Sequence, residues 1–220
     1  MRTVIQEHLD DLERDLIIMS KMVITAIQRS VTALKEQDQE EAVQIKKDDK
    51  QINEIRWEIE EKAIKLIATQ QPVARDLRKM IAILNIITDL ERMGDHAGGI
   101  ASITLKLGDG PSVKPLIDIP RMAEISVGMI ENALTAYKER DERAARAIHK
   151  QDDQIDDLYN QIIRELVSIM IEDPKTITRC TYLIWVAHNL ERIGDRVTNI
   201  CERIIYLVTG KMIGEITEED

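Results

Sequence analysis

The sequence predicts an all-α protein made of two tandem three-helix bundles, and three observations support this. Aromatic residues make up only 3%, Phe is absent, and there are only nine Gly and five Pro, whereas a β fold favours aromatic and turn residues. Apolar residues recur at helical spacing, as at Ile52, Ile55, Ile59 and Ala63, and no segment alternates like a strand. The third observation is that most of the sequence occurs twice.

The duplication is clearest in two pairs of segments. "DLERMGDHAGGIA" from Asp89 matches "NLERIGDRVTNIC" from Asn189 at an offset of 100 residues. "ALKEQDQEEAVQIKKDDKQIN" from Ala33 matches "AYKERDERAARAIHKQDDQID" from Ala136 at an offset of 103. The offset changes little because small length differences fall in turns, where they cost little. We therefore expect a first repeat over residues 1–108 and a second over 109–220.

Each repeat is predicted to contain three helices joined by short turns, so that neighbouring helices run antiparallel. Asp38 is an expected N-cap, as is Thr3. Pro72 and Pro174 suit the first turn of a helix, where a missing N–H does no harm. The expected helices cover residues 4–36, 40–69, 73–107, 119–139, 142–171 and 175–209.

Charge and composition exclude several classes of protein. The net charge of −10 disfavours nucleic-acid binding, because such a surface repels phosphate on average. No apolar run approaches the ~18 residues of a membrane span, and the charged N-terminus does not resemble a signal peptide, so we expect a cytoplasmic protein. Cys180 and Cys201 lie too far apart on one expected helix to pair and are expected to be buried thiols.

Two pairs of acids raise the question of function. Glu91 and Asp95, like Glu191 and Asp195, lie four residues apart and therefore on the same side of a helix. Like charges at this spacing repel by roughly 0.2–0.5 kcal/mol. Gly94 and Gly194 directly precede the aspartates, and we expect them to allow close helix packing.

The antiparallel arrangement brings further polar residues to the same height. Counted from the turn before the third helix of each repeat, Asp49 and Asn53 lie opposite the first acid pair. Asp152 and Asp156 lie opposite the second pair. Each repeat thus gathers three or four carboxylates beside an apolar stripe, where they need a countercharge.

Three countercharges are open from the residues alone. The first is protein, and the second is protonation of the acids. The third is a hard cation such as Mg²⁺, Ca²⁺, Mn²⁺ or ferric iron, which prefers oxygen ligands. His96 follows Asp95 and is expected on the surface. The basic residues nearest in sequence are Arg92, Arg192, Lys46, Lys47 and Lys150.

These motifs resemble the PhoU family of phosphate-signalling proteins. The resemblance covers almost the whole chain and includes "DDKQIN", "DDQIDD" and "KPLIDIPRMAE". It implies a cytoplasmic negative regulator of the phosphate-starvation response that modulates phosphate uptake and carries out no catalytic step. It also implies an adaptor between the ATPase subunit of a phosphate ABC transporter and a membrane sensor histidine kinase.

The resemblance further implies multinuclear metal clusters of iron, with Mg, Mn and Zn as the other candidates. The first repeat departs from the family pattern, because Asn53 replaces an acid and Gly99 and Ser102 replace Asn199 and Glu202. We therefore expect tighter metal binding in the second repeat. The implied ligands are Asp49, Asn53, Glu91, Asp95, Asp152, Asp156, Glu191 and Asp195, with Asn199 and Glu202 as additional candidates.

Two other functions remain open from the residues. One is a carboxylate-bridged metalloenzyme, either a di-iron oxidase or a phosphohydrolase, although the E-x-x-H motif of ferritin-like bundles and a Gly-rich phosphate loop are missing from the sequence. The other is a metal-free helical scaffold. We also expect a homodimer, because helical bundles with surplus apolar surface often pair.

Overall fold

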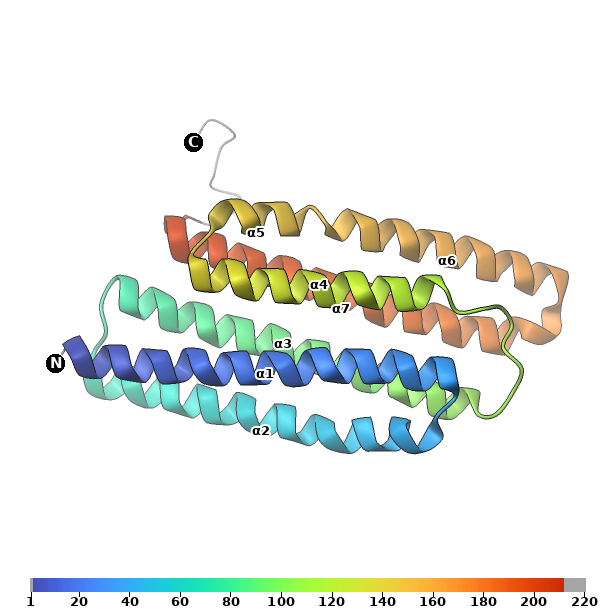
Figure 1. Cartoon of the computed structure of the whole chain (residues 1–220), viewed down its shortest axis with the longest axis horizontal. Helices are drawn as coiled ribbons and strands as arrows, with labels where there is room; N and C mark the ends of the chain where they lie inside the picture. The colour runs from blue at the N-terminus through green and yellow to red at the C-terminus, as the bar shows by residue number, and fades with distance from the viewer. Residues whose placement is uncertain (1, 212–220) are drawn as a thin grey trace.

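The computed structural model describes residues 2–211, with side chains described from residue 5 onward, and over this range the chain is helical without strands. Figure 1 shows long helices packed side by side. The elements are α1 (Arg2–Glu36), α2 (Gln39–Gln70), α3 (Arg75–Leu107), α4 (Asp118–Glu139), α5 (Glu142–His149), α6 (Asp152–Glu172), the 3₁₀ turn η1 (Pro174–Thr176) and α7 (Ile177–Thr209).

The predicted helices are present, with one correction. The range 142–171 was expected to be one helix, but it is broken at Lys150 and Gln151 into α5 and α6. At both residues ψ is close to −17°, and the amide of Gln151 donates to the carbonyl of Ile148. A bond between residues three apart is of the 3₁₀ type, which interrupts the α-helical ladder. The break makes Asp152 the first residue of α6.

The helix ends repeat between the two halves. The carboxylate of Asp38 accepts from the amide of Glu41 at 2.9 Å, and that of Asp141 accepts from Ala144 at 2.9 Å. Both are N-caps that satisfy a free amide of the first turn. Pro174 lies in the first turn of η1, whereas Pro72 precedes α3 by three residues. The expected cap Thr3 lies inside α1, which already begins at Arg2.

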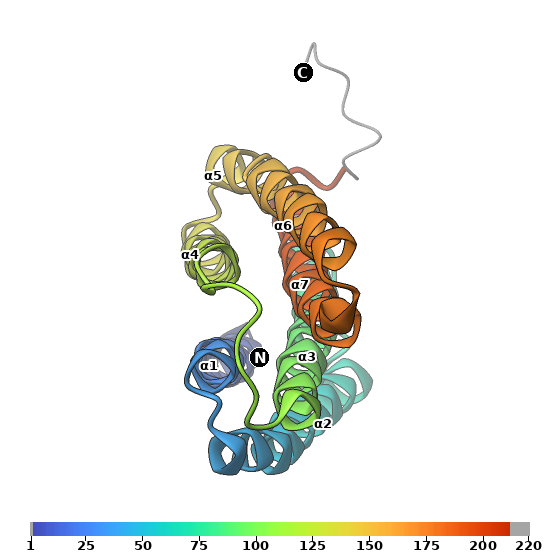
Figure 2. The same cartoon turned by 90° about the vertical axis from the view of Figure 1, so that its right-hand side faces the viewer.

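The helices form two layers, which Figure 2 shows end on. In one layer α2, α3, α7 and the α5–α6 rod follow one another along a curve, each packed on the next. In the other layer α1 and α4 lie together on the concave side of that curve. The core between the layers is aliphatic, and both cysteines are buried and unpaired, as predicted.

Helix α1 is long and apolar enough over Ile5–Glu36 to cross a membrane by length and composition. In this fold many of its apolar side chains are buried in the core. Leu9, Leu16 and Val23 recur every seven residues, and each is fully buried. A helix with such a stripe packs its apolar face against the core and exposes the opposite face.

The packing of α3 on α7 joins the two repeats through polar contacts that occur in matched pairs. Asn199 Nδ2 donates to Asp89 Oδ1 at 3.1 Å, and Arg196 lies 3.5 Å from the same oxygen. The equivalent contact of the other repeat pair joins His96, which corresponds to Arg196, with Asn189, which corresponds to Asp89. There His96 Nδ1 donates to Asn189 Oδ1 at 3.0 Å. The prediction of a surface His96 is wrong, because this hydrogen bond holds it partly buried between the helices.

A second polar junction ties α1 to the following repeat. Glu13 Oε1 accepts from Tyr137 Oη at 3.0 Å, Arg140 Nη2 at 2.9 Å and Lys79 Nζ at 3.0 Å. Tyr137 is buried, so its hydroxyl depends on this partner, and the Arg140 guanidinium stacks over the same ring. One carboxylate therefore connects α1, α3 and α4.

We expect Glu13→Ala to lower the free energy of unfolding by about 2–3 kcal/mol, because it leaves a buried hydroxyl without an acceptor and two cations without their partner. Urea denaturation followed by circular dichroism measures the change. Glu7→Ala, at an exposed position of the same helix, is the control and should stay within about 0.5 kcal/mol. Equal effects of the two substitutions would show that the junction does not stabilise the fold.

Candidate functional site

The predicted acids of the second repeat come together between α6 and α7. Burial, together with repulsion from Asp156, Asp195 and Glu191, raises the pKa of Asp152 to about 7. Burial followed by the charge of Asp195 also raises the pKa of Asp156 and of Glu191. Carboxylates perturb one another in this way when they lie near one another, so the four expected acids share one region of the α6–α7 packing.

Two oxygens in this cluster lack hydrogen-bond donors. Asp152 Oδ1 and Glu191 Oε2 are buried and have no hydrogen-bond partner in the structure. His188 Nδ1 lies 3.4 Å from Glu191 Oε2, and Arg192 donates to Asp195 Oδ2 at 2.6 Å. Arg192 thus compensates one acid of the four. Buried oxygens without a donor are uncommon in proteins and indicate a place for a proton, an ion or water.

Gly194 makes room for the carboxylate of Asp152. A Cβ at Gly194 would collide with Asp152 Oδ1 and would lie 2.9 Å from Ile155 Cδ1. Gly94 faces the corresponding Asp49 and Ile52 in the first repeat, with the Asp49 oxygen 3.5 Å from the position of a Cβ. The expectation of close packing holds, and what packs against each glycine includes a site carboxylate.

The first cluster has the same layout and weaker coupling. Burial raises the pKa of Asp49, and the charges of Asp95 and Glu91 act in the same direction. Asn53 Nδ2 lies 3.5 Å from Asp49 Oδ2, so the amide replaces one repulsive carboxylate with a donor. Arg92 lies 3.6 Å from both Glu91 and Asp95.

The two additional candidates lie apart from the four acids of the second cluster. The Asn199 side chain donates to Asp89, across the junction between the repeats. Glu202 faces the end of α5, with its Oε1 4.0 Å from His149 Nε2. Sequence reasoning missed Asp89 itself, which is buried in the α3–α7 junction and whose pKa is raised by that burial. Its sequence signal was a charged residue at the end of a mostly apolar helix segment.

The residues fit a hard cation in donor type but not as a finished coordination shell. Every predicted ligand offers oxygen, which Mg²⁺, Mn²⁺ and ferric iron prefer, and two oxygens of the second cluster lack donors. Among the side chains from residue 5 to 211, however, no three His, Cys, Asp or Glu side chains are grouped closely enough to hold a metal ion. Of the other countercharges considered, Arg92 and Arg192 are in place, and the raised pKa of Asp152 favours protonation near neutral pH.

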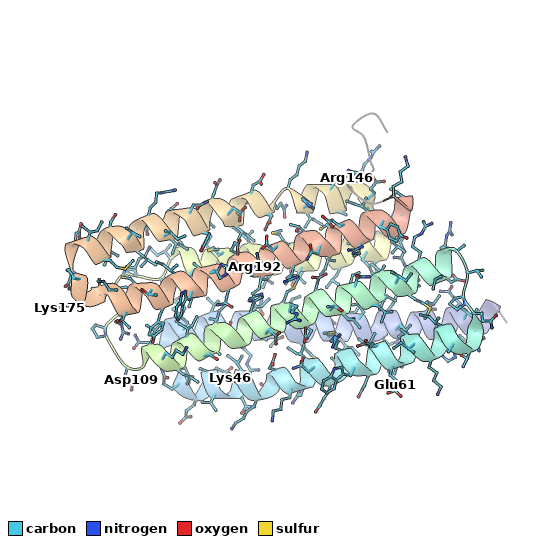
Figure 3. All side chains as sticks on the ribbon, turned by 180° about the vertical axis from the view of Figure 1, so that it is seen from behind. Lys46, Glu61, Asp109, Arg146, Lys175 and Arg192 are labelled. Atoms are coloured by element: carbon cyan, nitrogen blue, oxygen red, sulfur yellow. The ribbon has the colours of Figure 1, made fainter. Side chains whose placement is uncertain are left out.

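Figure 3 shows the exposed side of the layer that carries both clusters, with Arg192 about midway along α7. This fold and its two acid clusters define a class of all-α proteins built from two copies of one three-helix unit. The PhoU domain model matches residues 16–104 and again 119–204. The chain belongs to the PhoU family.

Relatives and solved structures agree over nearly the whole length. The chain is 41% identical to a phosphate-specific transport system accessory protein PhoU homolog of Clostridium acetobutylicum, covering 96% of this chain and 97% of that protein. It is 37% identical to the homolog of Aquifex aeolicus, with 94% of each chain covered. The crystal structure of PhoU from Pseudomonas aeruginosa superposes with a TM-score of 0.89 at 35% identity, over 94% of this chain and 99% of the other.

The raised pKa of Asp152 gives the metal-free protein a pH-dependent stability. A carboxyl with a raised folded pKa favours folding most below its unfolded value near 3.9 and loses that contribution as the pH rises through about 7. Asp152→Asn in EDTA should therefore be more stable than the unsubstituted protein by about 1–3 kcal/mol at pH 8. The difference should disappear near pH 4.

Urea unfolding at several pH values measures this difference, with Asp10→Asn at an exposed position of α1 as the control. If the free energies of unfolding of Asp152→Asn and of the unsubstituted protein differed by the same amount from pH 4 to 8, the pKa of Asp152 would not be raised in the folded protein.

Proposed function

We propose that this chain is an accessory protein of a phosphate transport system and acts as a regulator rather than an enzyme. The observation that carries the proposal is the double match to the PhoU domain over nearly the whole chain. The relatives are named as accessory proteins of phosphate-specific transport. A solved structure from Streptococcus pneumoniae, similar with a TM-score of 0.88 at 31% identity, is described as a phosphate transport system regulatory protein.

In this proposal the chain works in the cytoplasm as an adaptor. It limits phosphate uptake and represses the phosphate-starvation response by linking the ATPase subunit of a phosphate ABC transporter with a membrane sensor histidine kinase. A homodimer is part of the same proposal. The rigid core between the two layers suits an adaptor, because it fixes the spacing of the surfaces that two partners contact.

The acid clusters are proposed to hold metal, iron or another hard cation among Mg, Mn and Zn. Asp152, Asp156, Glu191 and Asp195 would supply the main site. When bound, the metal supplies the positive charge that the second cluster lacks. The protein's own residues orient the site: Gly194 lets the Asp152 carboxylate approach α7, and Arg192 holds Asp195. The weaker site would use Asp49, Asn53, Glu91 and Asp95.

Metal content tests this part of the proposal. We expect elemental analysis of protein supplied with iron, manganese, magnesium and zinc to find bound metal. Glu191→Ala/Asp195→Ala should lose a larger share than Glu91→Ala/Asp95→Ala, because the second cluster has four carboxylates and the first has three. On stepwise chelation the first repeat should lose metal first. Glu54→Ala/Glu58→Ala, an exposed acid pair of the same spacing on α2, should change nothing.

Absence of metal under all four supplies, or equal loss in the Glu54→Ala/Glu58→Ala control, would contradict a metal site.

A reporter of the phosphate-starvation response in the source organism tests the regulatory role. Deletion of the gene should activate the reporter in phosphate-rich medium, and the unsubstituted gene should restore repression. We expect Glu191→Ala/Asp195→Ala to restore repression of the reporter only in part, because in this proposal the regulator needs the metal site that these acids form. If the deletion strain kept full repression and normal phosphate uptake, the proposed function would be wrong.

A further inference from the structure

A cavity of about 330 Å³ opens between α1 and α2, the two helices that Figure 1 shows side by side in the first repeat. Its floor is buried and includes Ile45 and Ile52 of α2 and Gly94 of α3. Its mouth is formed by exposed residues, among them Ile18 and Lys21 of α1. This space, here named the α1–α2 cavity, therefore reaches from the surface down to α3.

A difference between the repeats makes room for the α1–α2 cavity. Ala26 lines it, and the offset of 103 residues places Met129 at the equivalent position of α4. Met129 is 1% exposed, so in the second repeat a longer side chain is packed into the core at this place. Protein interiors are close-packed, and the small methyl group of Ala26 leaves open a volume that the methionine of the other repeat would take up.

The walls of the cavity are mostly apolar. Ile18, Met22 and Ala26 of α1 line it together with Ile45 and Ile52 of α2. Ile18 is 46% exposed, so a ligand that covered it would remove apolar surface from water. A concave site of about 300 Å³ or more, with apolar walls and a few polar groups, is the usual form of a small-molecule site.

The charged side chains indicate which ligand the cavity suits. Arg29 donates to Glu41 and, at 2.7 Å, to Asp48, so these charges compensate one another. Lys21 is exposed, and among the side chains described from residue 5 to 211 it has no carboxylate within ion-pair distance. The mouth of the cavity therefore offers one cation to a ligand.

The acid at the other end of the cavity sets the orientation of the ligand. Asp49 lines the cavity, and its carboxylate lies 3.5 Å from the position of a Cβ at Gly94, beside α3. A negative group of a ligand would be repelled by Asp49 and attracted by Lys21. It would also keep its contact with water at the mouth, whereas burial of a charge is costly.

We propose that the α1–α2 cavity binds a small amphipathic anion, with its apolar body between the helices and its negative group at the mouth beside Lys21. This inference goes beyond the proposed function and does not depend on metal in the clusters. Asp49 and Gly94 line the cavity and also form part of the first acid cluster, so the bound ligand would lie directly against that cluster.

The test uses the full chain in EDTA and two fluorescent dyes that share one apolar body. Anilinonaphthalene sulfonate carries a negative group, and phenylnaphthylamine is the same molecule without it. Fluorescence titration measures the dissociation constant of each dye. We expect saturable binding of the sulfonate at one site per chain, and binding of the neutral dye that is weaker by about fivefold or more, because it lacks the charged contact with Lys21.

One substitution tests whether the dyes occupy the cavity. Ala26→Met introduces the side chain that the second repeat carries at this position. It should weaken the binding of both dyes by about tenfold or more, because the added side chain takes up the space that they need. Thr32→Met, at an exposed position of α1 outside the cavity, is the matched control and should leave both dissociation constants unchanged.

A second substitution tests the charge of the ligand. Lys21→Gln should weaken the binding of the sulfonate by about fivefold or more and leave that of the neutral dye unchanged, because only the sulfonate contacts the lysine. Lys35→Gln, at another exposed position of α1, is the control. Circular dichroism checks that each variant is folded, and Lys21→Gln stays informative if Ala26→Met lowers stability because it replaces an exposed side chain.

The outcomes separate the site from the charge of its ligand. Absence of saturable sulfonate binding, or binding that Ala26→Met leaves unchanged, would overturn the site. Equal affinity for the two dyes, or equal losses in Lys21→Gln and Lys35→Gln, would overturn the anionic class of ligand. The role in phosphate transport is tested separately by the reporter strain, so it stands or falls independently of the cavity.

Discussion

The antiparallel packing of α3 on α7 is the interaction on which the rest of the structure depends. Each repeat supplies one of these helices to the common core, so neither repeat buries its apolar stripe completely without the other. The crossing contains polar residues as well as aliphatic ones, and a buried polar group is tolerated only in the register that gives it partners. Asp89 finds Asn199 and Arg196 in this register, which fixes how one repeat sits on the other.

That register also determines where the acids lie. Residues 91–95 and 191–195 flank the crossing, so the two clusters come to the middle of one exposed side instead of opposite sides of the molecule. The glycines at 94 and 194 then let α2 and α6 bring their own carboxylates against the central helices. The packing of the core therefore keeps acids close enough to repel one another, and the pKa of Asp152 is raised to about 7. A helical scaffold without a function at this site would gain stability by losing these acids.

The two repeats share some equivalent core positions but differ at the site. Met19 and Met122 occupy equivalent core positions and are both fully buried. By contrast, Asn53 stands where the second repeat has Asp156, and the continuous α2 stands where the second repeat has the break before Asp152. The second cluster therefore has more mutual repulsion between carboxylates, and it contains the two buried oxygens that lack hydrogen-bond donors.

The sequence by itself determined the helices, the duplication and the identity of the paired acids. Helical spacing and antiparallel turns depend on short-range geometry, which predicts from the sequence alone that Asp49 lies opposite Glu91 and Asp152 opposite Glu191. Only the tertiary structure decided the α5–α6 break, the burial of Asp89 and His96, and the outward placement of both clusters on one side. The burial of Asp89 and His96 depends on contacts between residues about a hundred positions apart. Such contacts leave no periodic pattern in the sequence, because they are set by how two complete repeats pack together.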